Sequence, residues 1–123
     1  FQYINFIRDI AEDIKLNRSY FPQDELRTFG LRTLNYDEIK HKSEDFKSFM
    51  RFQIDRYHKW MHEAEKGFYF IPRRYLIPIK TASDMYQWTA KTIMRDPMIV
   101  YRNKVKPCVR RIIFSIIYNT IFG

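Results

Sequence analysis

The stretch FQYINFIRDIAEDIKLNRSYFP, residues 1–22, decides the fold class of this chain. Its apolar residues recur at steps of three and four, which predicts a helix with one face turned toward a core. The helix is expected to run from Phe1 to about Asn17, because Pro22 disfavours helical angles at Phe21. The predicted core face consists of Tyr3, Ile4, Phe6, Ile7, Ile10, Ala11 and Ile14.

The opposite side of this helix is polar. At roughly 100° of rotation per residue, about a third of the circumference holds Gln2, Asn5, Asp9, Glu12 and Asp13. Asp9 and Asp13 are stacked four residues apart, and like charges at this spacing cost a few tenths of a kcal/mol. A hard cation such as Mg²⁺, which binds carboxylate oxygens and substrate phosphates, would offset that cost. The alternative for a bare DxxxD pattern is a solvated acidic face paired with Arg8, Lys15 or Arg18.

A longer pattern extends beyond the two aspartates. It reads Q-x-x-N-x-x-R-D-x-x-E-D-x-x-x-x-R-x-Y-x-P and is formed by Gln2, Asn5, Arg8, Asp9, Glu12, Asp13, Arg18, Tyr20 and Pro22. This pattern closely resembles the second aspartate-rich signature of the squalene/phytoene synthase family, and the continuation PQDELRTFGL, residues 22–31, is similar as well. Weaker likeness continues to about residue 112, through Gly67, Ile71, Pro72, Ile79, Ala82, Tyr86, Ile93 and the basic segment 104–106.

The resemblance implies an all-α helical bundle, the C-terminal portion of a class I terpenoid synthase fold. It also implies a prenyltransferase that joins two prenyl diphosphates head to head, in the manner of a phytoene synthase acting on geranylgeranyl diphosphate. The alternative within the family is a squalene or dehydrosqualene synthase that uses farnesyl diphosphate, with NADPH required only for squalene. A non-catalytic helical assembly or binding protein that kept the fold is the alternative of another class.

The resemblance also assigns roles to residues. Asp9 and Asp13 would be the catalytic pair and would bind Mg²⁺, or Mn²⁺, together with Asn5. The diphosphate would contact Gln2, Arg8, Arg18, Tyr20 and Tyr86. For Tyr20 the alternative is a packed loop aromatic, and for Tyr86 it is a buried core tyrosine with a hydrogen-bonded hydroxyl. Glu12 is expected to support the ligands or to pair with Arg8 or Lys15.

Members of the resembled family carry another DxxxD motif upstream, on a facing helix. The remaining acidic residues here, such as Asp37 with Glu38 and Glu44 with Asp45, are adjacent in sequence and do not reproduce that spacing. Residues 1–123 are therefore interpreted as a single partial domain, the C-terminal half of such an enzyme. We expect it to need the N-terminal half as a partner and to be inactive alone.

Composition and charge limit the remaining options. The chain of 123 residues is 46% apolar, contains only three glycines and therefore favours one helical core. A single cysteine, Cys108, excludes an internal disulfide, and with no secretory signal in view a cytoplasmic location is expected. The net charge of +8 comes entirely from residues 67–123, which hold ten basic and two acidic residues. A nucleic-acid binder would leave the stacked carboxylates unexplained, so no nucleic acid is expected as a partner.

Three further helices are predicted downstream. Asn35 with Glu38 resembles a capping box at the start of a helix reaching about Lys66, and the next helix should run from beyond Pro78 to about Arg95. The first of them has a predicted core stripe formed by Ile39, Ser43, Phe46, Phe49, Met50, Gln53, Ile54, Tyr57, Trp60, Met61 and Ala64. The second should bury Ile79, Ala82, Met85, Tyr86, Thr89 and Ile93.

The last predicted helix, residues 112–123, is uncharged and is preceded by basic residues. About twenty residues are needed to span a bilayer, so this segment is too short. We expect it to pack on the bundle, with peripheral contact to a membrane interface as the alternative. His41, His58 and His62 lack a third ligand at a suitable spacing and are interpreted as surface residues.

Overall fold

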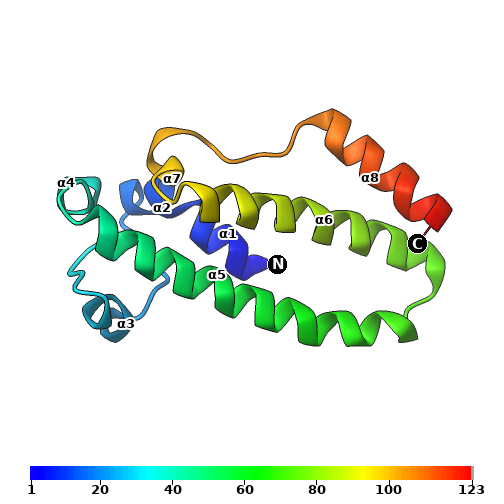
Figure 1. The fold of residues 1–123 in the computed structure, drawn as a ribbon, viewed down its shortest axis with the longest axis horizontal. Helices are drawn as coiled ribbons and strands as arrows, with labels where there is room; N and C mark the ends of the chain where they lie inside the picture. The colour runs from blue at the N-terminus through cyan, green and yellow to red at the C-terminus, as the bar shows by residue number, and fades with distance from the viewer. Residues whose placement is uncertain (123) are drawn as a thin grey trace.

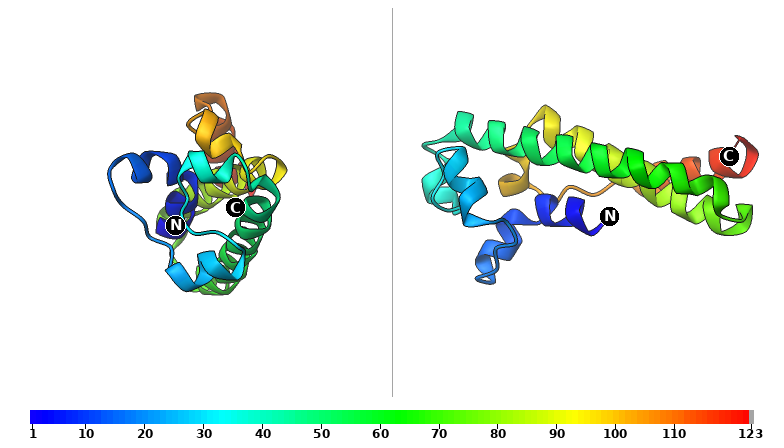
Figure 2. Two further views of the ribbon diagram at one scale, coloured as in Figure 1. Left: turned by 90° about the vertical axis from the view of Figure 1, so that its left-hand side faces the viewer. Right: turned by 90° about the horizontal axis from the view of Figure 1, so that it is seen from below.

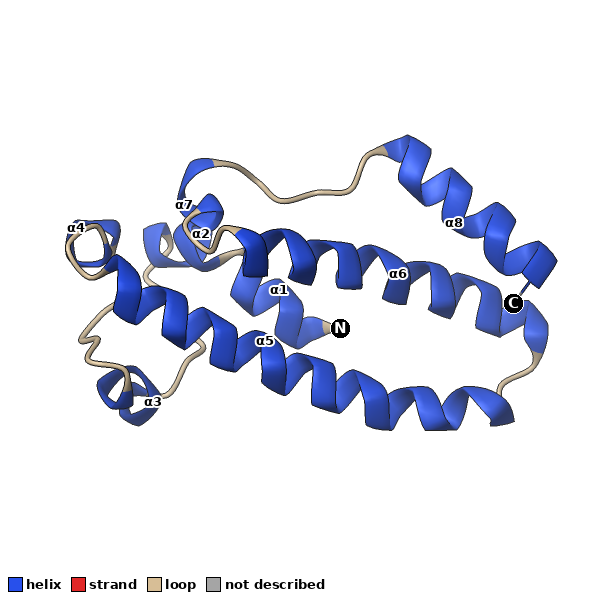
Figure 3. Ribbon diagram, viewed as in Figure 1, coloured by secondary structure: helices blue, strands red, loops and turns tan. Residues whose placement is uncertain are grey.

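Two long helices, α5 (Ser43–Glu65) and α6 (Arg73–Arg95), form the body of the computed structural model, which describes residues 1–122 (Figure 1). They run in opposite directions and are joined by the short 3-10 helix η1 (Lys66–Phe70). Within these described residues every regular element is a helix and none is a strand (Figure 3), which confirms the predicted all-α fold class.

Helix α1 (Gln2–Arg8) packs against both long helices (Figure 2). Ile4 and Ile7 of α1 have no solvent-accessible surface, and Ile10 has almost none. Their partners on the long helices are also fully buried and include Phe46, Met50, Ile54, Ala90 and Ile93. The apolar stripe predicted for residues 1–14 therefore faces the core, and its polar side is fixed by that packing.

The short helices gather at one end of the long pair, where loops carry further core residues (Figure 1). These helices are α2 (Ile10–Lys15), α3 (Gln23–Thr28), α4 (Tyr36–Ile39) and α7 (Ile99–Arg102). The buried side chains from this end are Phe21, Leu26, Leu31, Leu34, Ile39, Val100 and Val105. Tyr101 of α7 joins two of the segments, because its hydroxyl donates to the Leu34 carbonyl oxygen at 2.6 Å.

The predicted continuous first helix is wrong at one residue, Asp9. Its backbone turns out of helical angles, with φ −98° and ψ 19°, and separates α1 from α2. Asp9 N still donates to the Asn5 carbonyl oxygen at 2.9 Å, so the chain bends without unravelling. The bend lets Asp9 pair with Arg8, a neighbour that would point away from it on a regular helix.

Two left-handed residues end the helices α2 and α3. Asn17, with φ 56°, follows α2, and the Arg18 amide donates to the Asp13 carbonyl oxygen at 2.8 Å. Gly30, with φ 77°, follows α3, and the Leu31 amide donates to the Leu26 carbonyl oxygen at 2.8 Å. Both are Schellman turns, in which asparagine or glycine takes the left-handed position. The predicted end of the first helix near Asn17 is confirmed.

The predicted helix from Asn35 to Lys66 is interrupted at residues 40–42, which separate α4 from α5. The Asn35 side chain makes no capping hydrogen bond. Instead the Glu38 carboxylate reaches back to the Thr33 amide at 2.6 Å and the Arg32 amide at 3.2 Å. Lys42 Nζ also donates to the Gly30 carbonyl oxygen at 2.9 Å. The side chains of Glu38 and Lys42 therefore form hydrogen bonds with the preceding loop, and the expected capping box at Asn35 does not form.

The core stripe predicted on α5 is largely confirmed, since its residues from Phe46 to Met61 are buried except for Trp60. Trp60 and Ala64 are exposed, although one side of the Trp60 ring lies 4.8 Å from the ring of Tyr3 on α1. Helix α6 begins at Arg73, so Pro78 lies inside it and not before it. Thr89 and Ile93 are buried as predicted, whereas Ile79, Ala82, Met85 and Tyr86 are only half-buried.

Helix α8 (Val109–Phe122) returns along the outer side of α6 (Figure 1), so the expected packing on the bundle is confirmed. The predicted helix also included Gly123, which lies outside the described residues. Of the helices within residues 1–122, none combines the length and the hydropathy that crossing a membrane requires.

The Glu38 turn gives a first prediction. Replacing Glu38 with glutamine should lower the free energy of unfolding at neutral pH by about 1–3 kcal/mol, because hydrogen bonds to a charged acceptor are lost. Hydrogen bonds from Thr33 hold the pKa of Glu38 below its ordinary value of 4.5, so this stabilisation exists above that value and disappears as the pH falls through the folded-state pKa. Urea unfolding at several pH values measures the difference.

The matched control is Glu44→Gln, which changes an exposed glutamate paired only with Lys47 at 3.4 Å. Surface pairs of this kind contribute little, so its effect should stay below about 0.5 kcal/mol. An equal effect of both substitutions at neutral pH would contradict the role assigned to Glu38.

Candidate functional site

Asn5 lies where the polar side of α1 meets α6. Its Nδ2 is 3.5 Å from the hydroxyl oxygen of Tyr86, a residue 81 positions further along the chain. The Oδ1 of Asn5 is buried and has no hydrogen-bond partner. The Tyr86 ring stacks on Phe1, with 4.9 Å between ring centroids. The fold therefore brings two of the predicted site residues together and leaves one buried oxygen free to accept a ligand.

Asp9 forms a two-pronged ion pair with the adjacent Arg8. Arg8 Nε donates to one carboxylate oxygen at 2.8 Å, and a terminal nitrogen donates to the other at 3.0 Å. Both side chains are about four-fifths buried. The hydrogen bonds to Asp9 raise the pKa of the Arg8 guanidinium above its ordinary value. Because each carboxylate oxygen has two lone pairs, this pair leaves acceptor capacity on Asp9.

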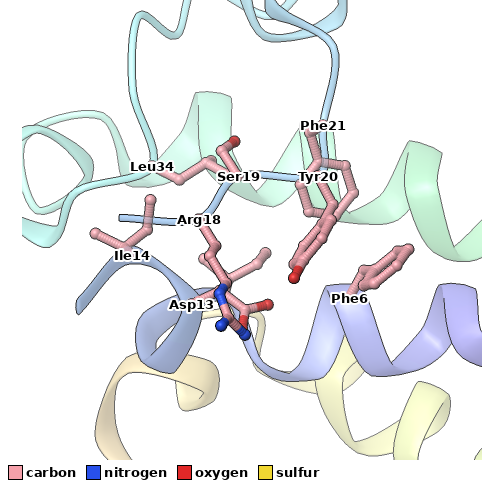
Figure 4. Close-up of a pocket in the computed structure, with 9 residues that line it drawn as sticks. Phe6, Asp13, Ile14, Arg18, Ser19, Tyr20, Phe21 and Leu34 are labelled. Atoms are coloured by element: carbon pink, nitrogen blue, oxygen red, sulfur yellow. The ribbon is translucent and has the colours of Figure 1, made fainter. Parts of the chain in front are cut away.

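Asp13 and Arg18 line a small cavity, together with Phe6, Ser19 and Tyr20 (Figure 4). The guanidinium of Arg18 lies beside the carboxylate of Asp13, since the turn at Asn17 folds the chain back onto the end of α2. Burial raises the pKa of Asp13, and repulsion by Asp9 adds to the rise, while Arg18 opposes it. The cavity measures about 10 Å³, which is room for no more than one water molecule.

Tyr20 lies over Phe6 at the same cavity. The two rings are nearly parallel, at 11°, and their centroids are 4.1 Å apart. Tyr20 is still almost half exposed. It is therefore a loop aromatic packed on α1, with part of its surface accessible beside Arg18, and its contact with a diphosphate stays a prediction.

Asp9 and Glu12 line a wider groove of about 440 Å³ between α2 and the segment that contains α7. The groove is basic, with Arg8, Lys15, Arg102 and Lys104 along its walls. Glu12 is exposed, and its carboxylate pairs with Lys104 Nζ at 3.6 Å. Its expected partners, Arg8 and Lys15, were therefore the wrong residues, because the C-terminal segment supplies a base that helical spacing cannot reveal.

The bend at Asp9 thus distributes the predicted acidic column over two neighbouring cavities, with Asp9 in one and Asp13 in the other. Gln2 is exposed on the first turn of α1, and no hydrogen bond from its side chain is found within residues 1–122. Asn5 and Arg8 lie further along α1 and are partly buried, and Tyr86 of α6 lies beside Asn5.

A polar network beside the site was not predicted. Glu25 of α3 accepts hydrogen bonds from Gln53 Nε2 at 2.9 Å and from Arg56 at 2.6 Å, and Gln53 also accepts one from the Tyr3 hydroxyl. Burial opposes ionisation of Glu25, but these hydrogen bonds outweigh it and hold the pKa of Glu25 below its ordinary value. The sequence signal was Gln53, a polar residue in an otherwise apolar core stripe.

The oxygen atoms of Asn5, Asp9 and Asp13 suit Mg²⁺, which does not need a complete shell of protein ligands. Within residues 1–122, no three His, Cys, Asp or Glu side chains are grouped closely enough to hold a metal ion. Mg²⁺ usually needs only one or two carboxylates, with water and substrate phosphates completing its shell. The unpartnered Asn5 Oδ1 and the carboxylates of Asp9 and Asp13 match that donor chemistry. The three histidines are all exposed, as predicted.

Comparison with known proteins gives a match over most of the chain. Residues 1–112 match the family model described as squalene/phytoene synthase. Among curated proteins, 15-cis-phytoene synthase of Synechocystis sp. is 29% identical over 107 residues, which cover 84% of this chain and 30% of that protein.

Plant relatives match over a shorter region. Phytoene synthase 2, chloroplastic, of Solanum lycopersicum is 43% identical over 67 residues, and phytoene synthase, chloroplastic, of Daucus carota is 39% identical over 66 residues. Each alignment covers 54% of this chain, and they cover 21% and 16% of the two relatives. The chain thus spans less than a third of the length of these relatives. No solved structure matches it.

The unpartnered oxygen of Asn5 leads to a prediction about stability. Asn5→Leu should leave the free energy of unfolding unchanged or raise it by about 1 kcal/mol, because a buried acceptor without a partner is replaced by an apolar group of similar size. Urea unfolding without divalent metal measures this.

Gln53→Leu is the matched control, since Gln53 is a buried amide whose two ends, unlike Asn5 Oδ1, are hydrogen-bonded. It should lose about 2 kcal/mol or more, because Glu25 and Tyr3 lose their partner. A comparable loss for Asn5→Leu would show that the Asn5 oxygen is already paired in the folded protein.

Proposed function

Because the chain belongs to the squalene/phytoene synthase family, we propose that it supplies the diphosphate-releasing site of a prenyltransferase. The proposed reaction is the head-to-head condensation of two prenyl diphosphates, with geranylgeranyl diphosphate as the substrate and phytoene as the product. The names of the relatives, which are phytoene synthases, favour this pair over farnesyl diphosphate and squalene.

The observation that carries the proposal is the buried Oδ1 of Asn5, which has no partner although it lies beside Tyr86 and one turn from Asp9. A buried acceptor without a donor is costly, and such costs are retained where function requires them. Asn5, Asp9 and Asp13 would hold Mg²⁺ or Mn²⁺. When bound, the ion would stabilise the negative charge that develops on a departing diphosphate.

The basic residues of the site would bind the diphosphate itself. Arg18 is exposed beside the Asp13 cavity, and its planar guanidinium can bind two phosphate oxygens at once. Arg8 is held in place by Asp9, which orients its remaining N–H groups. Lys15, Arg102 and Lys104 line the wider groove and give it a positive potential that attracts an anionic substrate.

The tyrosines would contribute hydroxyl groups at the edges of the site. Tyr86 lies within reach of Asn5 on the inner side, and Tyr20 is exposed next to Arg18 on the outer side. Each can donate one hydrogen bond to a phosphate oxygen without adding charge. Gln2, exposed on the first turn of α1, would reach the diphosphate only from the open end of the helix.

The aspartates give the sharpest test of this function. In the complete enzyme that contains these residues, Asp9→Asn or Asp13→Asn should lower kcat by about two to four orders of magnitude, since stabilisation of the leaving group is lost. Steady-state assays with Mg²⁺ and geranylgeranyl diphosphate measure the effect. Glu12→Gln is the matched control, because Glu12 is exposed and pairs with Lys104 outside the proposed ligand set. Near-normal turnover in both aspartate variants would remove the proposed roles.

A product assay separates the candidate reactions. The complete enzyme is expected to convert geranylgeranyl diphosphate to phytoene without NADPH. Squalene from farnesyl diphosphate with NADPH, or dehydrosqualene without it, would replace the proposed substrate and keep the proposed chemistry. Magnesium-dependent binding of a prenyl diphosphate without turnover would instead indicate a binding protein that kept the fold.

A further inference from the structure

Residues 18–22, the segment that carries Arg18 and Tyr20, have little backbone structure of their own. Within residues 1–122, the amides of residues 19–21 donate to no backbone carbonyl oxygen. A Schellman turn precedes the segment, and α3 follows it after Phe21, which packs edge-on against Phe49 of α5 with 5.3 Å between ring centroids. The placement of the segment over the site therefore depends on how α3 is fixed to the long helices.

Glu25, in the first turn of α3, fixes this helix to α5. Its two carboxylate oxygens accept from Gln53 Nε2 at 2.9 Å and from Arg56 at 2.6 Å. The Gln53 side chain is fully buried, and its oxygen accepts from the hydroxyl of Tyr3 on α1. These four residues form one connected set, the Glu25 network. Through it α5 joins α3, which follows residues 18–22, to α1, which carries the proposed metal ligands.

Such a network determines geometry more than stability. A partly buried ion pair gains little over apolar packing of similar volume, because both charges must leave water. A hydrogen-bonded network, however, is satisfied in only one arrangement of its members, and here both carboxylate oxygens and both ends of the Gln53 amide are paired. A shift of α3 along α5 would leave the Glu25 carboxylate, which is about three-quarters buried, without its donors.

We propose that the Glu25 network positions the Arg18 guanidinium for binding the diphosphate. This inference rests on the proposed function, in which Arg18 binds phosphate oxygens beside the metal ligands of α1. A contact through two N–H groups is sensitive to displacement, since both groups must point at phosphate oxygens at once. The network residues do not contact the diphosphate in this role, and they act through residues 18–22.

Binding of inorganic diphosphate to the complete enzyme with Mg²⁺, measured by isothermal titration calorimetry, tests this role. Glu25→Gln should raise the Kd about five-fold, because α3 loses its charged acceptor and Arg18 is displaced. A purely electrostatic effect would have the opposite sign, since removing a negative charge favours the binding of an anion. Asp24→Asn is the matched control, because it removes the same charge from the exposed neighbour of Glu25 in the same turn. It should leave the Kd unchanged or slightly lower.

A double-variant cycle determines whether the effect passes through Arg18. Arg18→Gln should raise the Kd at least about ten-fold, and adding Glu25→Gln to it should change the Kd by less than about two-fold. A merely structural role would weaken binding by the same factor in both backgrounds. Tyr3→Phe removes one hydroxyl and keeps the ring beside Trp60, so it should raise the Kd about three-fold with the same dependence on Arg18. It carries the test if Glu25→Gln does not fold.

Circular dichroism verifies that each variant is folded. An unchanged or lower Kd in Glu25→Gln, or equal factors with and without Arg18, would overturn the positioning role. The proposed function would survive that result if the unmodified enzyme binds diphosphate with Mg²⁺ and Asp9→Asn weakens the binding. Failure of the unmodified enzyme to bind diphosphate would overturn the proposed function and the positioning role together.

Discussion

The burial of Ile4, Ile7 and Ile10 between the two long helices is the interaction on which the rest of the structure depends. Burial of each such side chain contributes about 1.5–3 kcal/mol, so the rotation of α1 about its axis is strongly determined. Once that rotation is set, Asn5 must face Tyr86, and Arg8 with Asp9 must lie at the rim. The polar chemistry of the site is thus a consequence of apolar packing on the other side of the same helix.

Much of this fold could be predicted from the sequence, because the apolar stripe of α5 and the turn at Gly30 depend on local patterns. The bend at Asp9 could not be predicted, since Ile7 and Ile10 keep the helical period across it. The interruption after α4 accompanies a hydrogen bond between the Glu38 carboxylate and Thr33 in the preceding loop. A capping pattern that begins at Asn35 does not include Thr33, so it could not predict this contact.

The candidate site follows the same division. Residues on one helix face, such as Asn5 and Asp9, could be grouped by spacing alone. That Tyr86 of α6 belongs with them was suggested only by the family resemblance, and the structure places it beside Asn5. Contacts set by tertiary structure remained hidden, including the pairing of Glu12 with Lys104. The polar contact of α8 with α6, through Ser115 and Asn119, was hidden as well. Composition shows an apolar helix but not which side of it contacts the bundle.

The network of Glu25, Gln53 and Arg56 has a consequence for how this sequence can diverge. Two elements distant in the chain, α3 and α5, meet through the Glu25 carboxylate, so losing Arg56 alone would leave a largely buried charge without its cation. Substitutions at these positions should be accepted mainly in combination, with a neutral residue at 25 accompanied by neutral residues at 53 and 56. The residue types at positions 25, 53 and 56 are therefore expected to change together among relatives, even where the surrounding aromatic residues vary independently.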